Sequence, residues 1–388
     1  MYDLPTDRQR MSKHYLLPLF IFLLTVMSCG GEESIPPREP ETPVPGDSIE
    51  VPDTTSKDST PDIQVENFAR GAEISWYSQM EDNGKKFYSW SSREAKDCPT
   101  VMKELGLNAL ALRVLVNPTD GYCDVPDLLR KARAISLTDM DLLISFHFSD
   151  TIATSALQRT PVEWQGHSTE MLLEDIRDHV TQVLEALSEA DIQPRWIQIG
   201  NQLSQGLLWP EGDITRHANQ YAKMVNMGCL AAKTVFPEAT VIVAAGDPLN
   251  QSALCDALDQ LDKSLFDQIG LTLYPTLAVG SIFQSLGMGT SYKVTNVNDA
   301  IAYSLQTIDM LYNRYRKDCM IVECGVPVSM ETASSLAMRQ LVSEARNNSS
   351  CRGVIYWEPE AYEGWMGYTQ GAFLSNGRPT QIIDALSK

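Results

Sequence analysis

Short apolar, β-branched runs recur along this chain and alternate with segments in which apolar residues stand three and four apart. The runs have the length and composition of buried strands, and the spaced segments have the periodicity of amphipathic helices. Eight runs are candidate strands: Gly71–Trp76, Ala109–Val116, Leu142–Phe148, Trp196–Gly200, Thr240–Ala245, Ile269–Tyr274, Cys319–Glu323 and Gly353–Trp357. The clearest helical segments are Val125–Ala134, Thr169–Ala190, Ile214–Phe236 and Leu336–Asn347. Strand and helix alternating in this way predict a (β/α)8 barrel, the TIM-barrel architecture of the α/β class.

The N-terminal end of the chain follows neither pattern. Lys13 and His14 precede an apolar stretch at 16–27, and small residues surround the cysteine that follows. This order is typical of a secretory signal peptide, and the stretch is shorter than the roughly 20 apolar residues of a membrane span. Val26-Met27-Ser28-Cys29 resembles a bacterial lipobox. We expect residues 1–29 to be a lipoprotein signal peptide with Cys29 lipidated; an ordinary secretory signal with an incidental cysteine is the alternative.

The next segment, residues 30–63, is predicted to be a disordered, acidic, proline-rich linker. It holds seven prolines and nine acidic residues against two basic ones, so it buries too little apolar surface to fold. Its first residues, Gly30–Ser34, are similar to the acidic tag of Bacteroides-type surface lipoproteins. Residues 64–388 contain no second linker and suit one large domain. The predicted location is the bacterial outer membrane, cell surface or periplasm, with the N-terminal lipid holding the protein to the membrane.

The composition of the chain limits the classes of partner and cofactor that we expect. The chain has a formal net charge of −19 at pH 7, so nucleic acids and anionic membrane surfaces are not expected as partners, whereas a neutral glycan is compatible. Seven cysteines follow Cys29 without a CxxC pair, which favours isolated buried thiols and leaves one or two disulfides open. The five histidines are scattered and indicate no metal cluster. We expect a monomer.

Polar and aromatic side chains stand where the predicted strands end. In a (β/α)8 barrel the catalytic residues lie at the C-terminal ends of the strands. The residues at those ends are Arg113, His147, Asn201, Gln202, Tyr274, Glu323 and Trp357. Taken singly, Arg113 can be a structural ion pair, His147 a satisfied core residue, and the two aromatic residues interior packing. Glu323 is harder to explain in that way, because it follows a buried apolar run and a buried carboxylate needs compensating partners.

This set of residues fits the cleavage of a glycosidic bond. Retaining glycosidases place two carboxyl groups roughly 5–5.5 Å apart, one as nucleophile and one as general acid and base. Glu323 ends the seventh predicted strand and can serve as one of them. Asn201 can bind a sugar 2-hydroxyl, and Trp357 offers a flat face to a pyranose. Tyr274 can orient and ionise Glu323.

Longer motifs extend this interpretation across the body of the chain. They are Gly71–Ser75, Leu112–Pro118, Asp120–Asp124, Phe146–Asp150, Gln198–Asn201, Gly206–Pro210, Tyr274-Pro275, Val322-Glu323 and Tyr356–Pro359. With them the chain resembles glycoside hydrolase family 53, the arabinogalactan endo-β-1,4-galactanases, from about Phe68 to Leu386. The resemblance implies a retaining mechanism on a plant-type β-galactan or related glycan, with Glu323 as nucleophile and the residue after Asn201 as acid/base. We expect no cofactor; some members hold calcium in late loops, but no carboxylate-rich run here supports it.

The chain departs from this family at positions near the expected sugar contacts. Gln202 stands where the family has its acid/base Glu. Other departures are Ser145 for Asp, Ile152 for Trp, Val328 for Trp, the missing aromatic residue near Thr276, and Ala244-Ala245-Gly246 where the family usually shows His and Asp.

Three hypotheses remain open, because a carboxamide donates a hydrogen bond but transfers no proton near neutral pH. The protein can be a β-1,4-galactan hydrolase with reduced or altered activity, a non-catalytic lipoprotein that binds glycans at the cell surface, or a degenerate paralogue with neither role. Activity would survive on a leaving group that needs no proton. It would also survive if another acid reached the site, for which the candidates are Asp150, Asp247 and Glu358.

Overall fold

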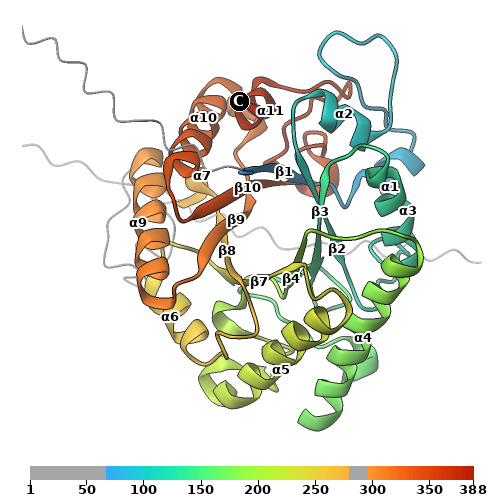
Figure 1. Ribbon diagram of the computed structural model, residues 1–388. Helices are drawn as coiled ribbons and strands as arrows, with labels where there is room; N and C mark the ends of the chain where they lie inside the picture. The colour runs from blue at the N-terminus through green and yellow to red at the C-terminus, as the bar shows by residue number, and fades with distance from the viewer. Residues whose placement is uncertain (1–66, 279–295) are drawn as a thin grey trace, which may run out of the picture. The chain divides into compact units, whose positions relative to one another are not determined.

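Eight parallel strands close into a barrel, and their order around it is their order in the chain (Figure 1). The computed structural model describes residues 67–278 and 296–388. The barrel strands are β1 (Ala69–Glu73), β2 (Ala109–Val114), β3 (Asp141–Phe146), β4 (Trp196–Ile199), β7 (Thr240–Gly246), β8 (Gln268–Leu273), β9 (Asp318–Cys324) and β10 (Cys351–Trp357). Pairing of β1 with β10 closes the ring. The predicted (β/α)8 barrel is confirmed, with each strand within a few residues of its expected position.

Helices surround the ring of strands (Figure 1). They are α1 (Tyr77–Asp82), α2 (Cys98–Glu104), α3 (Val125–Ser136), α4 (Thr169–Glu189), α5 (Ile214–Val235), α6 (Gln251–Asp259), α7 (Pro275–Ala278), α9 (Val297–Tyr315), α10 (Glu331–Asn347) and α11 (Gln381–Ser387). The four predicted helices are α3, α4, α5 and α10. Asp124, Ser168 and Asp213 stand before the first three and accept a hydrogen bond from a backbone N–H of the first turn, which stabilises each helix start.

Several short elements complete the chain between the barrel units. They are the hairpin strands β5 (Gly206–Leu207) and β6 (Gly212–Asp213), and the 3-10 turns η1 (Val162–Trp164), η2 (Leu203–Gln205), η3 (Val328–Met330) and η4 (Trp365–Gly367). The turn η2 begins directly after Gln202, with three residues between it and the end of β4.

Alternation along the strands separates two apolar cores. The smaller one fills the barrel with Ala69, Ala109, Ala111, Leu143, Trp196, Ile242, Ala244, Met320, Val322 and Ile355. The larger one lies between the sheet and the helices and includes Leu110, Ile144, Ile197 and Val243. Because successive strand residues point to opposite faces, an inward Ala109 and Ala111 on β2 place Arg113 inward as well. The last inward residue of each strand therefore reaches the barrel mouth.

Strand β9 breaks this alternation just before its end. Met320 and Val322 point into the barrel and Ile321 points to the outer core, so regular alternation would turn Glu323 outward. Instead the register with β8 shifts, and Thr272 pairs with Glu323 while Val322 is left as an extra residue. A β-bulge of this kind changes the direction of the side chain that follows it. Here it brings the Glu323 carboxylate into the barrel mouth.

The N-terminal predictions concern residues that the structure does not describe. The leader 1–29 with Cys29 and the linker 30–63 lie outside the described residues, as do the first residues of the predicted 64–388 domain. Within the described residues, no helix has the length and apolar character needed to cross a membrane. The seven cysteines from Cys98 to Cys351 are free thiols, and all but Cys255 are buried.

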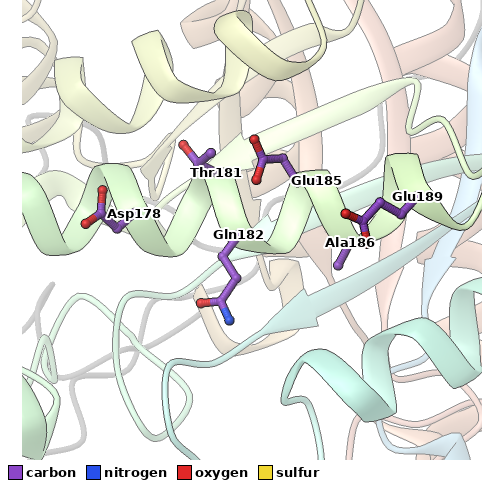
Figure 2. A pocket seen from close by; sticks show the side chains of 6 residues that line it. All are labelled: Asp178, Thr181, Gln182, Glu185, Ala186 and Glu189. Carbon is purple, nitrogen blue, oxygen red and sulfur yellow. The ribbon is translucent and has the colours of Figure 1, made fainter.

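The outer face of α4 carries a hollow lined by Asp178, Thr181, Gln182, Glu185, Ala186 and Glu189 (Figure 2). All six residues belong to one helix, and polar side chains on one face of a surface helix are its solvated side. None of them belongs to a strand end. We therefore assign this hollow no function.

Candidate active site

The carboxylate of Glu323 is the centre of a hydrogen-bond cluster at the barrel mouth. Its Oε1 accepts from the Tyr274 hydroxyl at 2.9 Å and from Gln202 Nε2 at 3.1 Å. Its Oε2 accepts from Asn201 Nδ2 at 3.2 Å and from Thr272 Oγ1 at 3.4 Å. Burial and the neighbouring Glu323 carboxylate raise the pKa of Tyr274 well above its ordinary value, so the phenol keeps its proton and remains a donor. Four uncharged donors thus hold Glu323, which is 7% exposed, in one orientation.

Gln202 is held at both ends of its amide group. Its Nε2 donates to Oε1 and Oε2 of Glu323 at 3.1 and 3.2 Å, and its Oε1 accepts from the backbone N–H of Ser155 at 3.1 Å. Its backbone is left-handed, with φ 50° and ψ 52°, a conformation uncommon outside glycine. The spacing leaves no room for the water that inverting glycosidases keep between carboxyl groups roughly 6.5–9.5 Å apart. The two side chains are therefore in direct contact.

Hydrogen bonds that involve Asn201, His147 and Gln158 hold the loop after β3 against the barrel mouth. Asn201 Nδ2 also donates to the carbonyl oxygen of Ala153, and Gln158 Nε2 donates to the carbonyl oxygen of Asn201. His147 Nδ1 accepts from the backbone N–H of Ala153 at 3.1 Å. Burial and the charge of Arg113 lower the pKa of His147 to about 3, so the ring is neutral. Since His147 is 2% exposed, its placement fits holding this loop better than contacting a sugar.

Arg113 lies beneath the mouth in a buried ion-pair cluster. Its Nη1 contacts Glu73 Oε1 at 2.7 Å and also Glu358 Oε1. Burial raises the pKa of Glu73, and burial together with Glu358 raises that of Glu360. The sequence placed Arg113 among the substrate-binding residues. The structure instead encloses it at 1% exposure, so we assign it a positioning role under the mouth.

Replacing Arg113 with methionine is expected to lower the free energy of unfolding by about 3–5 kcal/mol, as when one partner of a buried ion pair is removed. Glu73 and Glu358 would stay buried without their cation. Urea denaturation measures the loss, and adding Glu358→Gln to the variant should recover part of it. The control is Arg130→Met, which removes an exposed pair with Asp82 and should cost under about 1 kcal/mol. Equal losses in the two arginine variants would contradict the assignment.

Three aromatic rings form a wall beside this cluster. Trp357 meets Trp76 edge-on with ring centroids 5.0 Å apart, and it meets Tyr368 in the same way at 4.9 Å. The Arg113 guanidinium lies over both tryptophan rings, at 5.2 and 5.5 Å from their centroids. Trp357 is 8% exposed, whereas Trp76 and Tyr368 are half-buried. The wall, rather than Trp357 alone, presents aromatic surface to the mouth.

The three acids considered as substitutes for the missing carboxyl group are placed differently. Glu358 is fully buried against Arg113 and cannot reach a sugar. Asp150 uses one oxygen to accept the backbone N–H of Asn117 and the other to accept that of Val162. Asp247 is exposed beyond the end of β7 and accepts the backbone N–H of Leu249 with one oxygen.

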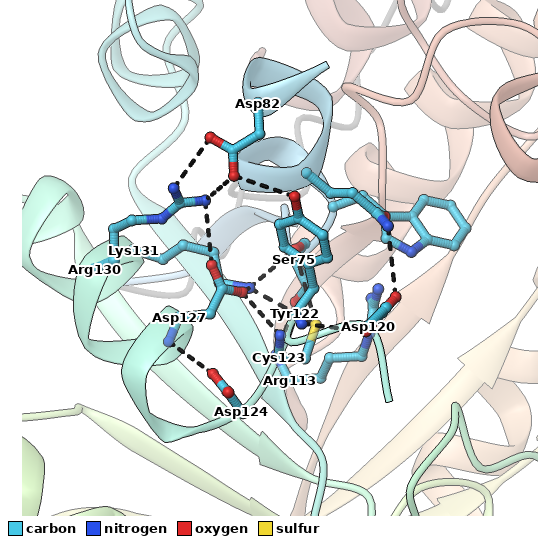
Figure 3. A network of polar contacts seen from close by, with 12 residues as sticks. Ser75, Asp82, Arg113, Asp120, Tyr122, Cys123, Asp124, Asp127, Arg130 and Lys131 are labelled. Atoms are coloured by element: carbon cyan, nitrogen blue, oxygen red, sulfur yellow. Dashed lines mark hydrogen bonds and ion pairs between the residues drawn. The ribbon is translucent and has the colours of Figure 1, made fainter. Parts of the chain in front are cut away.

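A polar network fixes the first two barrel units and with them the wall (Figure 3). Buried Lys131 on α3 binds Asp127 Oδ2 at 2.7 Å and the carbonyl oxygen of Ser75 at 2.9 Å. Arg130, on the same helix, pairs with Asp82 of α1. The Ser75 hydroxyl accepts the backbone N–H of Arg113 and donates to Glu73. The Tyr122 hydroxyl donates to Asp82, and the backbone N–H of Cys123 donates to Asp127, so the motif Asp120–Asp124 belongs to this structural network.

No three His, Cys, Asp or Glu side chains within 67–278 and 296–388 come together so as to hold a metal ion.

Comparison with known proteins decides the family. The profile described as Glycosyl hydrolase family 53 matches residues 69–381, which is most of the chain. The chain belongs to glycosyl hydrolase family 53.

Similar proteins match this chain over most of their own length. "Arabinogalactan endo-beta-1,4-galactanase A" of Aspergillus niger is 27% identical over 311 residues, covering 75% of this chain and 84% of the relative. An "uncharacterized protein in bgaB 5'region" of Niallia circulans is 27% identical over 314 residues, covering 76% and 85%. Among solved structures, the "Ignisphaera aggregans GH53 catalytic domain" has a TM-score of 0.70 at 21% identity, covering 85% of this chain and 97% of that one. A chain from "Structure of two fungal beta-1,4-galactanases" has a TM-score of 0.69 at 23% identity, covering 82% and 98%. These structures share its fold.

Two of the departures expected from the resemblance, Ser145 and Ala244, lie inside the barrel. Ser145 is 2% exposed on β3, and its hydroxyl has no hydrogen-bond partner among the described residues. Ala244 belongs to the inner core. Small side chains thus occupy two interior positions at which the resemblance led us to expect larger polar ones.

Sequence reasoning missed four residues that touch the site. Thr272 could have been found by stepping back two positions from Tyr274 on the same strand face. Nothing local marks Ser155, which reaches Gln202 through a folded loop. Trp76 and Tyr368 join the wall from segments far apart in the chain.

Proposed function

We propose that this family 53 protein is a retaining glycosidase of β-1,4-galactan or arabinogalactan, with Glu323 as nucleophile and a rate limited by the amide of Gln202. The observation that carries the proposal is the contact of Gln202 Nε2 with both oxygens of Glu323, at 3.1 and 3.2 Å. The family resemblance assigns the acid/base role to the residue after Asn201. The galactanase relatives supply the substrate class.

In this mechanism Glu323 attacks the anomeric carbon while its four donors keep it aligned. Asn201, already bound to Glu323, is placed for the sugar 2-hydroxyl, and the aromatic wall borders the ring. Gln202 can donate a hydrogen bond to the glycosidic oxygen but no proton. General acid–base assistance is worth roughly 10²–10⁴-fold, or about 3–5 kcal/mol, so the loss should be large for a sugar leaving group.

The second candidate is a non-catalytic lipoprotein that binds β-galactan chains. The specific observation in its favour is that the amide satisfies Glu323 at both oxygens, which leaves a hydrogen-bonded cleft without an acid. The half-buried aromatic residues Trp76 and Tyr368 would then serve binding alone.

Incubation of the native protein with β-1,4-galactan is expected to release galacto-oligosaccharides slowly, since nucleophilic attack remains possible without an acid. Chromatography of the products measures the release, and calorimetry with galacto-oligosaccharides measures affinity. Binding without products would favour the binding lipoprotein. If galactan, arabinogalactan and related β-glycans give neither a binding signal nor products, the third hypothesis, a degenerate paralogue with neither role, would be favoured.

We propose further that the protein acts as a lipid-anchored monomer at the bacterial cell surface or in the periplasm. The lipobox-like Val26-Met27-Ser28-Cys29 and the acidic, proline-rich 30–63 segment support the anchor and tether. Globomycin-sensitive processing, or labelling of the chain with a palmitate analogue that is lost on Cys29→Ser, would test the anchor.

A further inference from the structure

The site lacks an acid at position 202, and no described carboxyl group is hydrogen-bonded in its place. Asp247, exposed beyond β7, accepts the backbone N–H of Leu249 and makes no described hydrogen bond to Gln202 or Glu323. Glu73 is 4% exposed and bound to Arg113 and Ser75, and Glu358 and Asp150 are occupied as described above. No described carboxyl group other than Glu323 shares a hydrogen bond with Gln202. The amide is also fixed at both ends, by Glu323 and by Ser155. No described carboxylic acid is therefore bonded to the Gln202–Glu323 pair to protonate the departing group.

The nucleophilic half of the site is nevertheless complete. Glu323 keeps donors on both oxygens, and three of them, from Asn201, Tyr274 and Thr272, are independent of Gln202. A retaining reaction needs the acid only when the leaving group must be protonated. It needs the base only when the incoming nucleophile must lose a proton. Neither the acid nor the base is needed when the leaving group departs as a stable anion and the incoming nucleophile carries no proton to lose.

We propose that the native site turns over β-galactosides whose leaving group departs as a stable anion, acidic phenols above all, and transfers the sugar to an external anion. The proposal rests on the proposed function, because it uses Glu323 as nucleophile on a galactosyl group.

The steps balance without a proton or a redox partner. First, the Glu323 carboxylate forms a bond to the anomeric carbon, and the bond from that carbon to the phenolic oxygen breaks, so that the electron pair leaves as phenolate. Second, the external anion forms a bond to the anomeric carbon, and the glycosyl ester bond breaks to restore the Glu323 carboxylate. Two inversions give a product of the original β configuration.

The two groups that face the sugar carry no charge that would oppose an anion in the second step. Once Glu323 is esterified it is neutral, and Gln202 is neutral as well. A carboxylate at position 202 would repel an anion at this point, since like charges a few ångströms apart in a partly dry site interact strongly. The amide removes that repulsion, and the Nε2 hydrogen released by the esterified oxygen of Glu323 can donate to the anion.

The test uses the 2,4-dinitrophenyl glycoside of β-1,4-galactobiose with the native protein. We expect a burst of about one dinitrophenolate per protein, followed by slow turnover. Sodium azide should raise the steady rate at least about 10-fold, within the range that lost base assistance allows, and NMR should identify the β-galactobiosyl azide. Sodium chloride at the same concentration is the control for ionic strength. In Gln202→Glu, azide should have no such effect.

The outcomes separate this inference from the proposed function. No burst and no azide effect in the native protein, with Gln202→Glu active on galactan, overturns the inference and leaves the proposed function standing. Equal azide acceleration in both proteins also overturns it, because the effect would not depend on position 202. If the native protein shows no burst and Gln202→Glu is inactive on galactan, both fall.

Discussion

Gln202→Glu is expected to raise the turnover of β-1,4-galactan by about 10²–10⁴-fold, the usual worth of general acid–base catalysis. The amide nitrogen lies 3.1 and 3.2 Å from the oxygens of Glu323, so a carboxyl group in its place would face a second one at close range. Two such groups cannot both ionise easily, and the pKa of the introduced group should rise. It would then hold a proton near neutral pH, as the leaving sugar requires. A reducing-sugar assay on galactan measures the gain.

Gln205→Glu is the matched control for this experiment. It makes the same chemical change and adds the same charge within the turn η2, and its side chain has no role in the cluster around Glu323. It should leave the native rate unchanged. A folded Gln202→Glu protein no faster than the control would mean that the site has lost more than its acid, and the retaining mechanism proposed here would have to be abandoned.

Glu323→Ala is expected to remove all activity on galactan, in the native chain and in the Gln202→Glu background alike. Removal of a covalent nucleophile costs about 10⁶-fold in a well-studied case, because no other group can form the intermediate. The background with the restored acid is the sharper test, since its higher rate makes the loss measurable by the same assay.

Azide gives Glu323→Ala a distinctive product. With the carboxylate gone, azide can enter from its side of the sugar and displace dinitrophenolate in one inversion, giving an α-configured azide. Glu363→Ala, which truncates an exposed carboxylate in the loop after β10, is the control and should keep the parent rate. A Glu323→Ala protein with an unchanged rate would remove Glu323 from the mechanism.

The sequence by itself determined the architecture and which polar residues stand at the strand ends. Each strand and each long helix has its own periodicity, which the barrel preserves. Asn201, Gln202 and Tyr274 follow or end strands, and in a parallel barrel all strand ends meet at one mouth. Because each of these residues stands at a strand end, their contact with Glu323 could be expected from the sequence.

The tertiary structure alone decided how the side chains at the mouth divide their roles. Arg113 and His147 occupy strand ends like the others, yet Arg113 is enclosed by Glu73 and Glu358 and His147 holds a loop. Burial depends on segments distant in the chain, so no local pattern reveals it.

Glu323 shows the same limit most clearly. Strict alternation from Met320 would turn its side chain toward the helices, and only the register shift against β8 turns it into the barrel. A bulge arises from pairing between two strands, a relation that the residues of one strand do not contain. The chain thus specifies which residues stand at the strand ends, and the packing of neighbouring strands decides which of them turn into the mouth and face one another there.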